Sequence, residues 1–131
     1  MSMKQFGFPK KEHLKSKLAL DAVFSAKTKI YYKGIKCFYL IENSSETASI
    51  IKCGVGVSKR MFKLAVKRNR IKRLLKEAYR LENAEIKNWM MDKNISVSIF
   101  FSYQHKELPD ITNLRNEVRT ILSKIITQYK N

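Results

Sequence analysis

Residues Gly54 to Arg80 read GVGVSKRMFKLAVKRNRIKRLLKEAYR, and this stretch decides how the rest of the chain is organised. It begins as the end of an apolar strand, passes through a short basic turn and continues into a helix. From Lys59 to Arg80, ten of the 22 residues are Lys or Arg and one, Glu77, is acidic, so the segment carries +9 of the chain's net charge of +16. Positive charge gathered in one segment indicates a surface that binds a polyanion.

The helical part of this stretch has two different faces. From about Arg68 to about Leu81, apolar residues recur at the spacing of a single buried stripe, namely Ile71, Leu74, Leu75 and Ala78. The opposite arc carries Asn69, Lys72, Arg73, Lys76 and Arg80, with Arg70 at its edge. Repulsion among these like charges lowers the stability of the helix, and a bound RNA would neutralise it. We therefore predict that the apolar face packs on a core and that the cationic face binds RNA.

Length and composition favour a basic globular protein. The chain has 131 residues, of which 44% are hydrophobic, which is enough for one domain with a real core. Residues 1–13 are basic and contain Gly7 and Pro9, so we expect a partly mobile N-terminal arm. The sequence has no signal-peptide pattern and no apolar run near the roughly 20 residues of a membrane span. We expect a cytoplasmic protein with no membrane partner, and reduced thiols at Cys37 and Cys53.

The remaining elements are predicted from periodicity and from turn residues. A helix capped by Ser16 is expected over 17–25, and strands are expected over 29–32, 35–42, 49–57 and 95–102. Asn43 to Glu46 is predicted to be a hairpin loop, and 83–93 a helix or loop whose Trp89 and Met90 cover the edge of the core. Asp110 is expected to cap a last helix with the apolar stripe Ile111, Leu114, Val118, Ile121, Leu122 and Ile125.

Alternation along the strands predicts one apolar and one mixed face of the sheet. The apolar face should be the core, covered by helices, and the mixed face should be half-covered by the first helix. The mixed face carries Phe38, Lys52, Gly54, Gly56, Ser96, Ser98 and Phe100. Its glycines and lysine predict a shallow groove that another backbone can approach closely. Such a lining suits single-stranded RNA, because bases stack on aromatic rings and lysines bind phosphates.

The candidate site residues fall into two groups. Direct RNA contacts are predicted for the turn and helix residues Lys59, Arg60, Lys63, Lys67, Arg68, Asn69, Arg70, Lys72, Arg73 and Lys76. For Asn69, a hydrogen bond in packing or at a helix end is the alternative. A cleft for a single strand is predicted at Phe24, Phe38 and Lys52. Phe24 and Phe38 fit equally well as core residues or stacking platforms, whereas Phe100 is expected in the core.

The sequence offers no catalytic constellation. His13 and His105 stand far apart, the eleven carboxylates are scattered, and there is no Gly-rich phosphate loop or Ser/His/Asp spacing. Metal-dependent nucleases need converging carboxylates, and no convincing set is present. We therefore predict neither catalytic residues nor a metal site in this protein.

The block from Val57 to Ala78, V-S-K-R-x-x-x-x-A-V-x-R-N-R-I-K-R-L-L-x-E-A, resembles the signature of the protein subunit of bacterial ribonuclease P. The triplet Arg68-Asn69-Arg70 is the hallmark of that family. The run His13-Leu14, Leu20 and Val23-Phe24 is similar to the family's opening, although the family usually has Arg in place of His13 and Phe in place of Leu20. Lys63-Leu64 also stand where the family commonly has Gly-Asn.

The resemblance implies an α+β fold of order α-β-β-β-α-β-α. This is a two-layer sandwich with a four-stranded sheet and an unusual left-handed β-α-β crossover, of the ribosomal protein S5 domain 2-like type. General rules for crossovers predict the right-handed form. The left-handed form is therefore an expectation that comes from the resemblance alone.

The resemblance also implies a function, namely endonucleolytic maturation of tRNA at its 5′ end. The protein would bind the catalytic ribonuclease P RNA through the Arg68 to Arg70 helix, and the 5′ leader of precursor tRNA through the cleft. The Mg²⁺ ions for the chemistry would be held by the RNA subunit, in a complex of one protein monomer with one RNA. The alternative is a ribosomal-protein-like structural RNA binder with no role in catalysis. A basic amphipathic membrane binder is disfavoured, because the large apolar residues of the helix are needed inside the protein.

Overall fold

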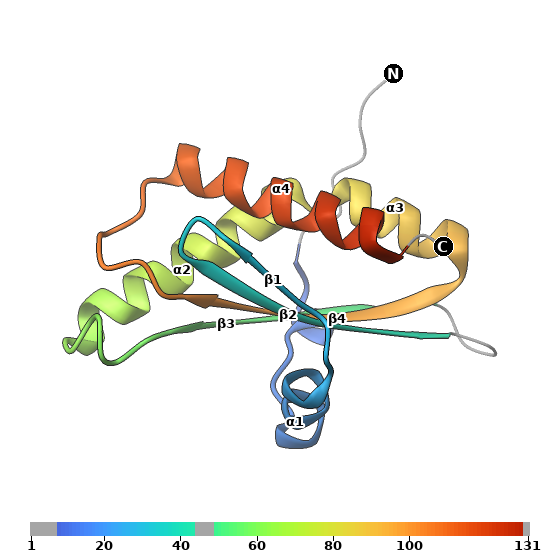
Figure 1. The fold of residues 1–131 in the computed structure, drawn as a ribbon, viewed down its shortest axis with the longest axis horizontal. Helices are drawn as coiled ribbons and strands as arrows, with labels where there is room; N and C mark the ends of the chain where they lie inside the picture. Colours follow the sequence, from blue (N-terminus) through green and yellow to red (C-terminus); the bar gives the residue numbers. More distant parts are fainter. Residues whose placement is uncertain (1–7, 44–48, 130–131) are drawn as a thin grey trace.

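The computed structural model describes residues 8–43 and 49–129. Residues 1–7 of the predicted arm and 44–46 of the predicted hairpin loop lie outside this part. The elements are a short 3-10 helix η1 (Lys10–Glu12), α1 (Lys17–Ser25), β1 (Lys29–Tyr32), β2 (Ile35–Asn43), β3 (Ile51–Val57), α2 (Ala65–Glu82), α3 (Ala84–Lys93), β4 (Ile95–Tyr103) and α4 (Ile111–Tyr129). Helices α2, α3 and α4 lie over one face of the sheet and α1 lies under the other (Figure 1).

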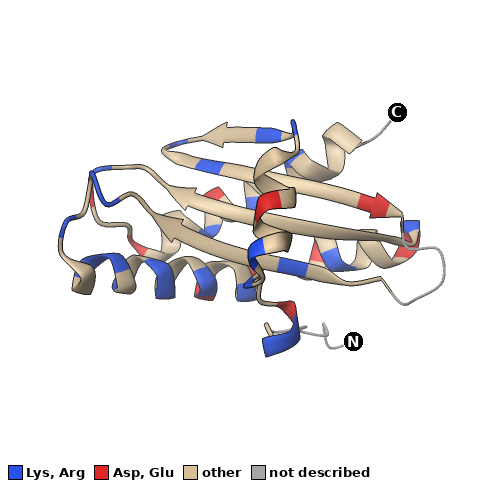
Figure 2. Cartoon of the chain, turned by 90° about the horizontal axis from the view of Figure 1, so that it is seen from below, with Lys and Arg blue, Asp and Glu red and all other residues tan. Residues whose placement is uncertain are grey.

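The four strands form one sheet in the order β1-β2-β4-β3. Strand β2 pairs antiparallel with both β1 and β4, whereas β3 pairs parallel with β4, with Ile51 opposite Val97 and Val57 opposite Tyr103. The connection between the two parallel strands runs through α2 and α3, over the face of the sheet that α1 does not cover (Figures 1 and 2). This crossover is left-handed, so the α+β fold and its unusual connection are confirmed.

The predicted hairpin between the second and third strands is wrong. Strand β4 lies between β2 and β3, which therefore share no hydrogen bonds. Alternate β4 residues from Ile95 to Tyr103 are all buried, as expected for a central strand. Strand β3 takes an edge, where its N-terminal half meets the chain at His13. Proximity in sequence suggested that β2 and β3 pair as a hairpin. The most apolar strand, β4, instead takes the place between them, and this sets the order of the strands in the sheet.

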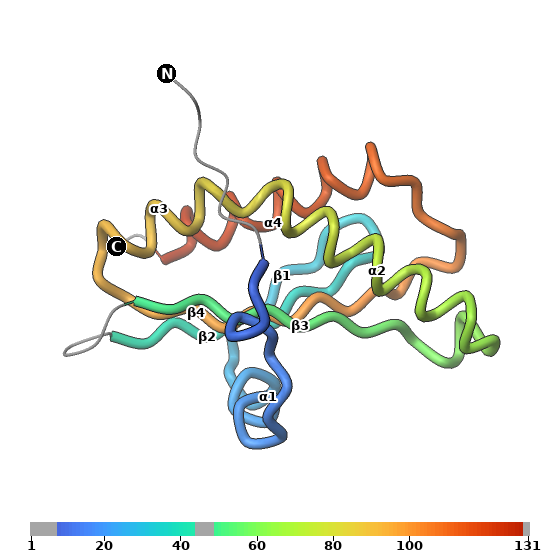
Figure 3. The backbone as a smooth tube through the Cα atoms, turned by 180° about the vertical axis from the view of Figure 1, so that it is seen from behind, coloured from blue at the N-terminus to red at the C-terminus, as the bar shows by residue number. Residues whose placement is uncertain are grey.

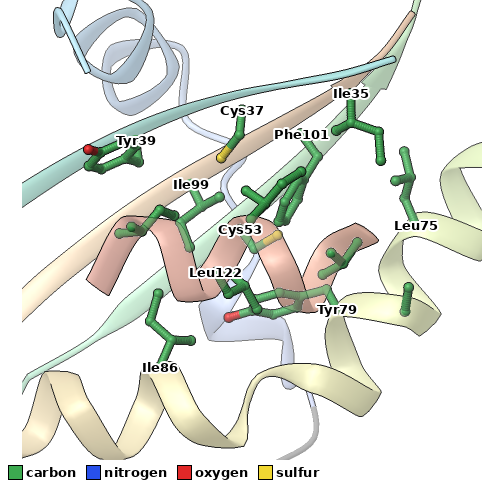
Figure 4. Close-up of a cluster of buried hydrophobic side chains, with 14 of the residues drawn as sticks. Ile35, Cys37, Tyr39, Cys53, Leu75, Tyr79, Ile86, Ile99, Phe101 and Leu122 are labelled. Atoms are coloured by element: carbon green, nitrogen blue, oxygen red, sulfur yellow. The ribbon is translucent and has the colours of Figure 1, made fainter. Parts of the chain in front are cut away.

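The core lies between the sheet and helices α2, α3 and α4 (Figure 4). The sheet contributes Ile35, Cys37, Cys53, Ile99 and Phe101, and all five side chains are buried. The α4 stripe is also confirmed, with Leu114, Val118, Ile121, Leu122 and Ile125 buried. Within α2 the buried residues are Ile71, Leu75, Ala78 and Tyr79, so the stripe includes a tyrosine that the pattern missed, while Leu74 is only partly buried. None of the helices in the described part is long and apolar enough to cross a membrane.

The residues predicted to cap the first and last helices, Ser16 and Asp110, do so in the structure. The Ser16 side chain accepts a hydrogen bond from the backbone N–H of Ala19, at 3.3 Å. The Asp110 carboxylate accepts one from the backbone N–H of Thr112, at 3.1 Å. Each satisfies an N–H group that has no partner inside its own helix.

The chain ahead of α1 packs against the outer edge of β3 (Figure 3). The backbone N–H of Leu14 donates to the carbonyl oxygen of Cys53 at 2.9 Å. The Phe8 ring stacks on His13, with ring centroids 4.0 Å apart, and meets the edge of Tyr79. Lys87 Nζ of α3 binds Glu12 Oε1 at 2.7 Å, and these side chains are only 5% and 12% exposed. We call residues 8–14 the N-terminal strap, because they tie β3 to α2 and α3.

Candidate nucleic-acid interface

Helix α2 begins at Ala65, one turn earlier than the apolar pattern indicates. The basic turn thus leads directly into the helix, and bands of Lys and Arg recur along α2 in Figure 2. We call this part of the surface the basic surface. It comprises Lys59, Arg60, Lys63, Lys67, Asn69, Arg70, Lys72, Arg73 and Lys76, all exposed except the half-buried Lys72. Nine of the ten residues predicted to contact RNA therefore belong to this surface, and each of them is at least partly exposed to solvent.

The cations of the basic surface are not neutralised by the protein's own carboxylates. Of the ten Lys and Arg residues from Lys59 to Arg80, only Arg80 forms an ion pair with an acid in the described part of the chain. Its Nη2 lies 2.7 Å from Glu77 Oε2, and this hydrogen bond lowers the pKa of the Glu77 carboxyl. The positive field of the eight Lys and Arg residues of the basic surface is thus available to an external anion.

The tenth predicted residue, Arg68, points back into the protein. Its Nη1 donates to the carbonyl oxygens of Phe62 and Lys63, at 2.7 and 2.8 Å. These two hydrogen bonds hold the turn just ahead of α2, whose N-cap residue Leu64 has no side chain that could accept from the free N–H groups of the helix. Arg68 therefore shapes the turn that presents Lys59, Arg60 and Lys63.

Asn69 is exposed, and no hydrogen bond involves its side chain among the described residues. The alternative role, a hydrogen bond within the protein's own packing, thus finds no support in residues 8–43 and 49–129. Its amide remains free to bind an RNA group beside Arg70.

On the opposite face of the sheet, three phenylalanines join α1 to the strands. The Phe24 ring meets Phe38 and Phe100 edge-on, with centroids 5.1 and 4.9 Å apart. Phe24 remains 41% exposed, whereas Phe38 and Phe100 are half-buried. Phe24 and Phe38, the two predicted cleft aromatics, are therefore in direct contact, and part of the Phe24 ring faces solvent.

The predicted groove at the two β3 glycines is filled. The Phe100 ring lies over both glycines, so closely that a Cβ at Gly56 would meet Phe100 Cζ at 2.8 Å. A Cβ at Gly54 would meet Phe100 at 3.0 Å and the strap residue Leu14 at 3.3 Å. The predicted close approach of another backbone is met at Gly54 by the strap, because the Leu14 carbonyl oxygen would lie 3.3 Å from a Cβ there. At Gly56 the Phe100 ring fills the space, so no open groove remains beside it.

Two lysines lie near the Phe38 ring of the phenylalanine cluster, which consists of Phe24, Phe38 and Phe100. Lys29 Nζ and Lys36 Nζ lie 5.9 and 5.2 Å from the centre of the Phe38 ring, within the range of a cation–π contact. Sequence reasoning missed both, although Lys36 stands two residues before Phe38 and thus on the same face of the strand. The predicted Lys52 lies on that face too, but two strands away, in the row of Leu40 and Ser98.

Two observations concern metal ligands and thiols among the described residues. They contain no group of three His, Cys, Asp or Glu side chains placed to hold a metal ion. Cys37 and Cys53 are free and buried, and burial raises the pKa of both thiols, which makes them poor nucleophiles at neutral pH.

The fold matches solved structures. A *Staphylococcus aureus* RNase P protein superposes with a TM-score of 0.63 at 17% identity, covering 87% of this chain and 94% of that one. A mutant of the *S. aureus* protein, described as defective in mRNA degradation activity, gives a TM-score of 0.64 at 16% identity. At such low sequence identities, the structural similarity shows a shared fold and nothing more.

Proteins related in sequence identify the family of this chain. The ribonuclease P protein component of *Porphyromonas gingivalis* is 31% identical over 120 residues, which is 92% of this chain and 87% of the relative. That of *Borrelia hermsii* is 34% identical over 113 residues, or 86% and 87% of the two chains. The family model described as Ribonuclease P matches residues 8–126, which include the strap, the basic surface and the phenylalanine cluster. The chain belongs to the ribonuclease P protein family.

Proposed function

We propose that this chain is the protein subunit of a ribonuclease P ribonucleoprotein and assists cleavage of precursor tRNA at the 5′ end of the mature sequence. The observation that carries the proposal is the basic surface, an unneutralised row of cations within a chain of this family. The proposed complex is cytoplasmic and contains one protein monomer and one RNA.

The basic surface is the proposed contact with the catalytic RNA. Its helix has a rigid apolar stripe in the core, so Arg70, Arg73 and Lys76 are held at fixed spacing on the outer side. Arginine and lysine bind phosphate oxygens and release the counterions condensed on RNA, which drives association. Arg68 holds the turn through Nη1, and its other guanidinium N–H groups can still bind a phosphate.

The proposed site for the 5′ leader lies on the α1 side of the sheet. Phe24 offers a partly exposed ring, and Lys29 and Lys36 flank the neighbouring Phe38. A base stacked on an aromatic ring contributes about 1–3 kcal/mol, and the lysines attract the phosphates between bases. Lys52 extends the positive lining across the sheet.

The proposed role of the protein in the reaction is positioning. The described residues do not supply a metal-binding group, so the Mg²⁺ ions that serve the cleavage are proposed to sit on the RNA subunit. By holding both the catalytic RNA and the leader, the protein brings the scissile bond to the RNA's metal ions and lowers phosphate repulsion between them.

Reconstitution with a bacterial ribonuclease P RNA tests this proposal. Added protein should lower the Mg²⁺ concentration needed for half-maximal cleavage and tighten binding of precursor tRNA with a leader more than that of mature tRNA. Phe24→Ala should weaken the leader-dependent part of the affinity by roughly fivefold or more. If the protein bound ribosomal RNA instead, and changed neither the Mg²⁺ requirement nor the leader effect, a structural role would replace this proposal.

A further inference from the structure

The protein has a large cavity that neither the basic surface nor the phenylalanine cluster includes. It has a volume of about 970 Å³ and lies where the turn after α1, the second half of β2, α3 and the end of α4 meet. Cavities of ligand-binding size run from about 300 to 1,000 Å³. Its volume is therefore sufficient for one nucleotide.

The walls of the cavity combine aromatic rings with cations. Trp89 of α3 and Tyr129 of α4 line it, with ring centroids 5.3 Å apart and planes at 82°. Lys27 and Lys93 line it from two different elements, and both are exposed. No Asp or Glu is among its lining residues in the described part of the chain. Aromatic rings beside lysines, with no carboxylate, are suited to a base and its phosphates.

Polar groups at the cavity can fix a base edge. Strand β1 pairs with β2 only from Ile35 to Phe38, so from Leu40 to Asn43 β2 has β4 on one side and no strand of the described residues on the other. Ile41, which lines the cavity, lies on this unpaired edge. The Gln128 side chain accepts a hydrogen bond from the Tyr39 hydroxyl at 2.6 Å. Among the described residues no hydrogen bond involves the Gln128 amide nitrogen, which remains a donor for a ligand.

We propose that this cavity binds one nucleotide of single-stranded RNA, with the base against Trp89 and the flanking phosphates at Lys27 and Lys93. The rival occupant, an extended peptide added to the open β2 edge, would use the backbone of β2 but would leave the lysines without a role. Charge therefore favours RNA. The site is separate from the proposed leader cleft, although Lys27 follows directly on α1 and connects the two surfaces.

Trp89 makes the proposal directly testable, because it is the chain's only tryptophan. A short oligoriboadenylate titrated into the full chain should quench its fluorescence in a saturable way. Trp89→Leu, which keeps an apolar filler, should weaken binding of a labelled oligonucleotide by about tenfold, the loss of one stacked base.

Charge-neutralising variants locate the phosphates. Lys27→Gln with Lys93→Gln should reduce the slope of log affinity against log salt by about 1.4, the value for two phosphate contacts in a single strand. Lys106→Gln is the matched control, because it removes one charge from the exposed loop before α4, at the other end of a helix about 28 Å long. Melting curves confirm that each variant is folded.

Three results would overturn the proposal. The first is an unchanged Trp89 fluorescence at oligonucleotide concentrations that saturate binding of the labelled strand. The second is quenching that survives the Lys27 and Lys93 changes but disappears with Arg70→Gln, which would place the strand on the basic surface. The third is quenching of Trp89 by an extended peptide only, which would make the cavity a protein-docking edge.

Discussion

At the scale of single residues, Arg68 differs most from its expected role. It belongs to the Arg68-Asn69-Arg70 triplet on which the family resemblance rests, and its guanidinium bonds two carbonyls of its own chain. Both hydrogen bonds come from one nitrogen, Nη1, which lies one bond farther from the backbone than the ammonium nitrogen of a Lys would. Arg68 therefore holds the turn from a distance that a Lys side chain reaches less well.

This role predicts a difference between two conservative substitutions. Arg68→Lys should lower the free energy of unfolding by about 1–2 kcal/mol, because hydrogen bonds from a charged group to the turn are lost. Arg70→Lys, the matched control on the exposed arc, should stay within about 0.5 kcal/mol of the wild type. Urea unfolding measures both, and equal losses in the two variants would contradict the assigned role of Arg68.

Glu117 of α4 gives a second prediction at this scale. It lines a pocket with Lys33, Tyr103, His105 and Asp110, and desolvation there raises the pKa of its carboxyl above 4.5. The folded state therefore binds this proton more tightly than the unfolded chain. The associated stability is present below the unfolded pKa and is lost as the pH rises through the folded value.

Glu117→Gln should consequently unfold at higher denaturant concentration than the wild type at pH 7. The difference should shrink as the pH falls toward 4.5. Asp92→Asn, at an exposed position of α3, provides the comparison for simple loss of a negative charge. A difference between wild type and Glu117→Gln that is constant over pH 4.5–7 would show that the carboxyl is not desolvated.

At the residue scale, the sequence predicted which residues lie on the basic surface, but it did not predict the contacts that side chains make within the protein. Periodicity placed Arg70, Arg73 and Lys76 on the outer arc of α2, because helical geometry alone fixes which residues share a face. The two acceptors of Arg68 are backbone carbonyls, which have no sequence signature. The ring over Gly54 and Gly56 was missed for a related reason, since alternation gives the face of Phe100 but not its tilt.

At the scale of elements, the N-terminal strap holds β3 and α3 together through one buried ion pair. Glu12 and Lys87 are 75 residues apart in sequence and nearly excluded from solvent. Removing one partner of a buried pair leaves an uncompensated charge, which costs far more than the pair itself contributes.

Lys87→Met should therefore lower the free energy of unfolding by about 3–5 kcal/mol, and the added change Glu12→Gln should restore most of the loss. Arg115→Met breaks an ion pair with Glu82 in which the arginine is 45% exposed, and should cost less than about 1 kcal/mol. Thermal or urea unfolding provides all four values. If Lys87→Met were as mild as Arg115→Met, the strap would not depend on the ion pair.

The elements themselves were largely predictable, because the strands alternate strictly and the helices carry clear stripes and caps. The order of the strands in the sheet was not predictable in the same way. Strand pairing depends on competition between β3 and β4 for the centre of the sheet, and that competition is decided by burial across the whole domain. The left-handed crossover was expected from the family resemblance alone, because general rules for β-α-β connections predict a right-handed one.

At the scale of the whole molecule, charge is divided between two faces that RNA can use together. The basic surface lies along α2, whereas α1, which contributes Phe24 to the phenylalanine cluster, lies on the opposite face of the sheet (Figure 1). With a net charge of +16, the protein has a positive field that favours an anionic partner. In the proposed function, folded RNA binds the basic surface and a single strand binds the phenylalanine cluster. No local window of sequence contains this division, since α1 and α2 are brought to opposite faces only by the sheet.

The central claim is that the basic surface binds folded RNA, and the salt dependence of affinity for a bacterial ribonuclease P RNA tests it most directly. The wild type should give a slope of roughly −4 to −7 in log affinity against log salt, for about 5–8 phosphate contacts. Arg70→Gln with Arg73→Gln should flatten the slope by about 1–2, whereas Lys106→Gln with Lys124→Gln, elsewhere on the surface, should leave it unchanged. Equal slopes for the wild type and the Arg70/Arg73 variant would contradict the claim.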